Sequence, residues 1–151
     1  GPYDLTDPLP DSDLTVGQAL LSPTRTYAPV IHNLLAQDRD AIRGIVHCSG
    51  GAQTKCLKFG RGVHFVKNDL FPTPPVFRAI QAASGTESKE MYQVFNMGHR
   101  LEIYCEESSV NEVIDVAGSF HIEAQQIGHT EANSTAANRL TIVHDGTTIE
   151  Y

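Results

Sequence analysis

The sequence predicts an α/β sandwich with a mixed sheet. Segments with strand-like and helix-like patterns alternate along most of the chain. The last segments are short strands joined by Asp145-Gly146, a pair typical of a tight hairpin turn, so the sheet is expected to end in an antiparallel portion. With 151 residues, of which 40% are apolar, the chain is long enough to bury one core. We therefore expect a single globular domain.

The N-terminal segment differs in composition from the rest. Residues 1–13 are rich in Pro and Asp and lack periodicity, so we expect an extended interdomain lead-in there and the folded domain over 14–151. Thr15 and Gln18 have the spacing of a capping box, which predicts a short helix ending near Leu21.

The middle of the chain alternates between the two kinds of pattern. Pro29 suits the first turn of a helix, and Gly85 suits the residue that follows the last turn of another. The predicted elements are an extended, β-prone stretch at 24–27 taken as a strand, a helix over 29–38, a strand at 44–48, a short helix over 52–59, a strand at 63–66, and helices over 75–84 and 87–95.

The C-terminal third begins with a segment in which apolar and polar residues alternate. This pattern at 101–105 predicts a strand with its apolar face buried. Ser109 and Glu112 form a second potential capping box, ahead of apolar residues spaced along one helical face. Further strands are predicted at 122–127, 140–143 and 147–151.

Charge and composition limit the possible partners. The chain has 11 Lys and Arg against 18 Asp and Glu, a formal net charge of −7, which disfavours general binding of nucleic acid or anionic membranes. No apolar run is long enough for a membrane helix, and the first residues do not resemble a signal peptide. Three cysteines without paired spacing indicate reduced thiols. We therefore expect a cytoplasmic protein with no membrane or nucleic-acid partner.

One segment suggests a binding site. At residues 44–52 an apolar strand reaches His47 and then the small residues Cys-Ser-Gly-Gly-Ala. Main-chain N–H groups in such a turn can converge on phosphate oxygens. The alternative is a plain tight turn between a strand and a helix, since adjacent glycines are common in loops.

Three segments in order resemble one enzyme family. They are 20–27 (LLSPTRTY), 47–52 (HCSGGA) and 90–98 (EMYQVFNMG). They are similar to the Pro-Thr-Arg-x-Tyr, His-Ile-Thr-Gly-Gly-Gly and Glu-Met-Tyr-x-x-Phe-Asn-x-Gly signatures of the C-terminal domain of phosphoribosylformylglycinamidine cyclo-ligase, also called aminoimidazole ribonucleotide synthetase. The resemblance implies a three-layer α/β/α sandwich that is partly ferredoxin-like.

The resemblance also implies a reaction. In this family ATP phosphorylates the formyl oxygen of formylglycinamidine ribonucleotide, and an amidine nitrogen then displaces it to give aminoimidazole ribonucleotide, ADP and phosphate in purine biosynthesis. ATP and Mg²⁺ are implied as cofactors, held largely by an N-terminal domain that these 151 residues do not resemble. That domain, the ribonucleotide, ATP and a second subunit are the implied partners, and this part alone is expected to be inactive.

The resemblance assigns candidate roles to matching residues. Arg25 is expected to clamp a phosphate, although a strand-edge arginine paired with an acid is the alternative. His47 is the candidate catalytic residue, as a proton donor or hydrogen-bond partner, or else a buried histidine bonded to a carbonyl. The candidate substrate or phosphate ligands are Thr24, Arg25, Ser49, Gly50, Gly51, Asn96 and Gly98.

Departures from the family leave other functions open. Ala52 replaces the third glycine, and His99-Arg100 replaces a small pair after the Phe-Asn-x-Gly turn. The same fold serves formylglycinamidine ribonucleotide synthase, selenophosphate synthetase, thiamine-phosphate kinase and a hydrogenase maturation factor, and a non-catalytic binding module is a further alternative. A Cys48–His47 dyad is disfavoured because strand neighbours face opposite ways, and the cysteines lack zinc-ligand spacing.

Overall fold

The chain folds into a mixed α/β structure with two separate sheets. The computed structural model describes all 151 residues. One sheet has four strands in the order β4-β2-β5-β6, and the other has two strands, β1 and β3. The α/β class is confirmed, but the three-layer sandwich is not, because β1 and β3 pair with each other outside the larger sheet.

The four-stranded sheet is mixed, as predicted. Its strands are β2 (Val63–Lys67), β4 (Gly128–Ala132), β5 (Arg139–His144) and β6 (Thr147–Glu150). Strand β2 is parallel to β5 and antiparallel to β4, and β5 and β6 form an antiparallel hairpin. In the hairpin turn both Asp145 and Gly146 have positive φ, +49° and +73°, which confirms the predicted tight turn.

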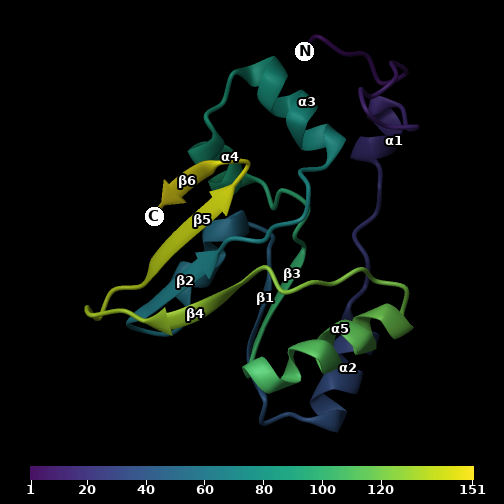
Figure 1. Cartoon of the computed structure of the whole chain (residues 1–151). Helices are drawn as coiled ribbons and strands as arrows, with labels where there is room; N and C mark the ends of the chain where they lie inside the picture. Colours follow the sequence, from purple (N-terminus) through teal and green to yellow (C-terminus); the bar gives the residue numbers. More distant parts are fainter.

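The two-stranded sheet carries the segments that matter for the site. Strand β1 (Ile42–His47) pairs antiparallel with β3 (Leu101–Cys105), and His47 lies opposite Leu101. In Figure 1 these strands lie between the pair of helices α2 and α5 and the four-stranded sheet.

All the predicted helices are present. They are α1 (Val16–Leu20), α2 (Ala28–Gln37), α3 (Pro75–Ser84), α4 (Ser88–Val94), α5 (Val110–Ser119) and the 3₁₀ helices η1 (Ala52–Lys58) and η2 (Glu107–Ser109). The capping box of Thr15 and Gln18 is formed at the start of α1. Gly85 ends α3 in the left-handed conformation with φ +68°. None of these helices has the length and apolar character needed to cross a membrane.

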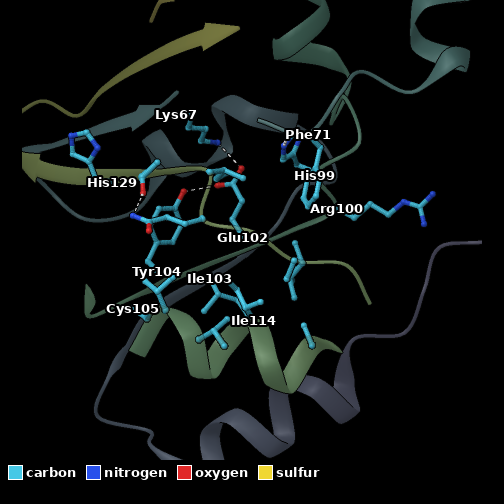
Figure 2. Close-up of a pocket in the computed structure, with 18 of the residues that line it drawn as sticks. Lys67, Phe71, His99, Arg100, Glu102, Ile103, Tyr104, Cys105, Ile114 and His129 are labelled. Atoms are coloured by element: carbon cyan, nitrogen blue, oxygen red, sulfur yellow. Dashed lines mark hydrogen bonds and ion pairs between the residues drawn. The ribbon is translucent and has the colours of Figure 1, made fainter. Parts of the chain in front are cut away.

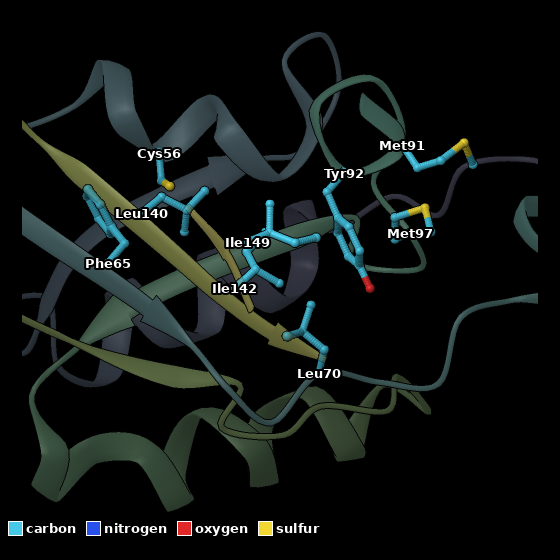
Figure 3. Packing of buried hydrophobic residues seen from close by; sticks show 9 residues of the cluster. All are labelled: Cys56, Phe65, Leu70, Met91, Tyr92, Met97, Leu140, Ile142 and Ile149. Atoms are coloured by element: carbon cyan, nitrogen blue, oxygen red, sulfur yellow. The ribbon is translucent and has the colours of Figure 1, made fainter. Parts of the chain in front are cut away.

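Two hydrophobic clusters hold the molecule together. The larger lies between the four-stranded sheet and α4, and Figure 3 shows its nine buried residues: Cys56, Phe65, Leu70, Met91, Tyr92, Met97, Leu140, Ile142 and Ile149. The smaller joins α2 to α5 through Val30, Leu34 and Val116. The two clusters are separate, so the space between them can hold a cavity.

Three local predictions are wrong. Residues 24–27 form no strand, and neither do 122–127; the last strand before the hairpin begins at Gly128 instead. Pairing sets this start, because Lys67 of β2 lies opposite Gly128. The second capping box is not formed, since Ser109 ends η2 and its main-chain N–H donates to Glu106.

The first 13 residues contain no helix or strand, but they are held against α1. The N–H groups of Val16 and Gly17 donate to the carbonyls of Asp7 and Leu5 at 2.9 and 2.8 Å, and Leu9 is buried. The division into a lead-in over 1–13 and a domain over 14–151 stays a prediction.

Candidate functional site

The glycine turn follows β1. The N–H of Cys48 donates to the carbonyl of Arg100 at 2.9 Å, which continues the pairing with β3 one residue past the strand. Gly51 then has φ +87° and directly precedes η1. Ala52, where the related signature has glycine, has φ +43°, a conformation that costs a non-glycine residue on the order of 1 kcal/mol.

The turn presents free donors beside a positive charge. We call the set of Ser49, Gly50, Gly51 and Lys55 the glycine-turn site. The Lys55 Nζ donates to the carbonyl of His47 at 2.9 Å and to the Ser49 Oγ at 2.8 Å. The main-chain N–H groups of Gly50 and Gly51 have no acceptor within the chain. An ammonium and two unused amides at an exposed turn are suited to an anion.

His47 lies at the edge of the glycine-turn site. Its side chain is exposed while its neighbour Cys48 is buried, so the two point to opposite faces as expected. The His47 ring lies 6.3 Å from the Tyr27 ring, measured between centroids. This contact brings the segment of Thr24 and Arg25 next to the strand that carries the turn.

Arg25 itself has a partner on another element. Its Nη1 donates to the main-chain carbonyl of His121, just past the end of α5, at 2.6 Å. Thr24 is exposed, and its side chain makes no hydrogen bond within the chain. The structure therefore places Tyr27, rather than Arg25, against His47.

The second predicted turn, Asn96 to Gly98, is packed into the molecule. The Asn96 Oδ1 accepts from the N–H of Gly98 at 2.9 Å. Gly98 has φ +99°, and a Cβ there would come within 3.0 Å of the Pro74 ring. Only glycine combines this conformation with this contact. The turn thus depends on glycine for packing as well as for φ.

A cavity of about 770 Å³ lies between the two clusters. One wall comes from β3 and α5 and the other from β2, β4 and the segment leading into β4 (Figure 2). Its lining is mainly apolar, with Arg100, Glu102 and His129 among the polar exceptions. Gly98 lines this cavity, whereas Thr24, Arg25, His47, Ser49, Gly50, Gly51 and Asn96 do not.

A buried polar network lies beside the cavity. The Lys67 Nζ is 2.5 Å from the Glu102 Oε1, and both side chains are 4% exposed. The Tyr104 hydroxyl donates to the Glu102 Oε2 at 2.5 Å. Figure 2 shows Lys67, Glu102 and Tyr104 converging from β2 and β3. The alternation of apolar and polar residues over 101–105 would place Glu102 on the exposed face of its strand, but Glu102 is buried, and Lys67 compensates its charge.

Burial shifts several pKa values near this network. Desolvation lowers the pKa of His99 to about 4, and its Nε2 accepts from the N–H of Phe71 at 3.1 Å. Burial, with the charge of Glu102, raises the pKa of the Cys48 thiol and of the Tyr104 hydroxyl. Neither thiol chemistry nor proton transfer by Tyr104 near neutral pH is therefore favoured.

The sequence did not identify the lysines that support the glycine turn and the buried network. Lys55 follows the turn by four residues, a spacing that could have marked it as a partner of the glycines. Lys67 ends an apolar strand pattern, and a charged residue there is a signal of a buried pair. No spacing in the sequence indicated that Lys67 and Glu102 meet.

The chain belongs to the family described as AIR synthase related protein, C-terminal domain, which residues 4–138 match. Particular relatives carry the name phosphoribosylformylglycinamidine cyclo-ligase. The protein of Methanopyrus kandleri is 36% identical over 130 residues, covering 85% of this chain and 36% of the relative. Those of Trichlorobacter lovleyi and Sorangium cellulosum are 33% and 34% identical over 134 and 130 residues, covering 86% and 82% of this chain. The chain spans 36–38% of the length of these three relatives. The family resemblance is thus confirmed.

Proposed function

We propose that this chain is the C-terminal part of an ATP-dependent cyclo-ligase that converts formylglycinamidine ribonucleotide to aminoimidazole ribonucleotide in purine biosynthesis. Family membership and the names of the relatives support the reaction class. The observation that carries the role of this part is the glycine-turn site, where two unused amides lie beside the ammonium of Lys55. An anionic group of the ribonucleotide, its phosphate, fits these donors.

Each candidate residue has a role in this proposal. The Gly50 and Gly51 amides, the Ser49 hydroxyl and Lys55 bind the phosphate. His47, exposed beside them, hydrogen-bonds the substrate and is the candidate proton donor. Arg25 and Thr24 extend the same site on one side, and Arg25 exchanges the His121 carbonyl for phosphate when substrate binds. Asn96 and Gly98 form its other side.

The ATP step depends on the rest of the protein. No three His, Cys, Asp or Glu residues of this chain form a group that could hold a metal ion. From the family resemblance we infer that ATP and Mg²⁺ are held largely by an N-terminal domain of the same protein. From the family resemblance we infer that the full-length enzyme is a cytoplasmic homodimer.

Complementation tests the proposal. The chain is combined with its N-terminal domain, and ATP-dependent formation of aminoimidazole ribonucleotide is measured. We expect ring closure with both parts and none with this chain alone. Absence of ring closure when both parts are folded and associated would overturn the proposal. Lys55→Met should raise the KM for the ribonucleotide, whereas Lys58→Met, an exposed lysine of the same 3₁₀ helix, should leave it unchanged.

A further inference from the structure

Gln53 is the junction between the two turns. It is fully buried, at 0% exposure, and lies in η1 directly after the glycine turn. Its Nε2 donates to the main-chain carbonyl of Asn96 at 2.7 Å. The main-chain carbonyl oxygen of Gln53 and its side-chain Oε1 each accept a hydrogen bond from the Lys67 Nζ at 2.9 Å. One side chain thus connects η1, β2 and the turn before β3.

The network around Gln53 is closed. The ammonium of Lys67 has three N–H donors, and its three acceptors are the Gln53 carbonyl, the Gln53 Oε1 and the Glu102 Oε1. Both Glu102 oxygens are used, one by Lys67 and one by Tyr104. Every charged atom of the network therefore has a partner inside the protein, and no N–H donor of Lys67 is left for a ligand.

Stability alone is a weak reason for such a network. Burying a lysine and a glutamate carries a desolvation cost that their attraction does not reliably exceed. Apolar residues of the same size often stabilise the folded state equally well. Directional hydrogen bonds, in contrast, fix relative position in a way that apolar contacts do not. The geometry matters here because Gln53 reaches Asn96, whose turn also contains Gly98.

We propose that Gln53, held by Lys67 and Glu102, is a positioning residue that fixes the Asn96–Gly98 turn relative to the glycine-turn site. This inference rests on the proposed function for its catalytic consequence. Held in this way, the donors of the glycine-turn site and the side-chain amide of Asn96 contact the ribonucleotide at one fixed distance from each other. Small errors in such a spacing cost much of the rate or affinity.

The sharpest variant is Gln53→Glu in the full-length protein. A glutamate keeps oxygen acceptors for Lys67, but it replaces the donor that faces the Asn96 carbonyl and adds a buried negative charge, whereas Gln53→Met removes the donor without adding charge. The matched control is Gln81→Glu, which makes the same chemical change on α3, where Gln81 donates to Thr86 and Ser88. We expect the KM for the ribonucleotide to rise about tenfold or more in Gln53→Glu, with the KM for ATP unchanged, and no change in Gln81→Glu.

A second readout needs no activity. In ¹⁵N-glycine-labelled, ligand-free protein, we expect Gln53→Glu to shift the amide signals of both Gly51 and Gly98. Leu34→Val, a core substitution on α2 in the separate smaller cluster, should shift neither. If Gln53→Glu fails to fold, the same comparison is made with Gln53→Met.

The outcomes are distinguishable. An inactive wild-type protein counts against the proposed function, while the glycine signals still decide the positioning role. Unchanged Gly51 and Gly98 signals in the folded variants would overturn the positioning role. An unchanged ribonucleotide KM in an active Gln53→Glu enzyme would overturn it as well.

Discussion

The two turns of the candidate site differ in what surrounds them. At Gly50 a Cβ would meet nothing within 4 Å, and the turn around it is exposed. At Gly98 a Cβ would meet the Pro74 ring, and the neighbouring Met97 and His99 are buried. The open turn has unused donors, whereas the donors of the packed turn serve the fold. The main-chain amides of a glycine motif can therefore bind a ligand only where they remain free, and in the packed turn this leaves the side-chain amide of Asn96 as the candidate donor.

The largest expected effect concerns the packed turn. Gly98→Ala should lower the free energy of unfolding by about 3 kcal/mol, because it adds both φ strain and overpacking against Pro74. Gly50→Ala should change it by less than about 0.5 kcal/mol. Denaturant unfolding of both variants checks the difference. Equal losses in the two variants would contradict the distinction between the turns.

His99, which follows the packed turn directly, makes the stability of that region depend on pH. Its pKa of about 4 in the folded protein lies below the unfolded value of 6.5, so the unfolded state binds more protons between these values and stability falls as pH drops through this window. From pH 7.5 to 5 the loss due to His99 should be about 2 kcal/mol. His99→Gln, whose amide oxygen can accept from Phe71, should remove that part of the pH dependence in urea unfolding. An unchanged dependence would contradict the buried neutral histidine.

Lys55 tests the open turn. Lys55→Met should raise the KM of the full-length enzyme for the ribonucleotide about tenfold, because one charge-assisted hydrogen bond to phosphate is lost. Its unfolding free energy should change little, since the side chain bonds only to an exposed turn. Steady-state kinetics and thermal unfolding measure the two quantities. A lowered stability with an unchanged KM would assign Lys55 to the fold instead.

Arg25 gives the smallest expected effect. Arg25→Met should lower the free energy of unfolding by about 0.5 kcal/mol, since it removes one exposed hydrogen bond to the His121 carbonyl. It should raise the ribonucleotide KM less than Lys55→Met does. Arg61→Met, which removes an exposed arginine without a hydrogen bond, is the control for charge. A KM equal to that of the control would remove Arg25 from the site.

Local signals in the sequence predicted most elements and both turns. Capping of α1, the glycine that ends α3 and the positive φ of Gly51 and Gly98 all depend on residues close in sequence. The start of β4 at Gly128 does not, because pairing with β2 sets it. The separation into two sheets likewise depends on contacts between distant strands, which no local pattern encodes.

The candidate site likewise has features that the local sequence predicts and features that only the structure shows. The free amides after β1 follow from the local glycine sequence, and the family signatures added His47 and Asn96 as candidates. The connection through Gln53, Lys67 and Glu102 joins residues 14 and 35 positions apart. Alternation in β3 placed Glu102 on the exposed face, and only the partner on β2 explains its burial. Long-range charge pairing therefore had to come from the structure.

The central claim is that the amides of Gly50 and Gly51 hold the phosphate of the ribonucleotide. The most direct measurement is a titration of the ¹⁵N-glycine-labelled full-length protein with formylglycinamidine ribonucleotide. The account predicts saturable downfield shifts of the Gly50 and Gly51 amide protons, weakened in Lys55→Met, with the exposed Gly118 unaffected. Unmoved Gly50 and Gly51 signals in a protein saturated with that ribonucleotide would contradict it.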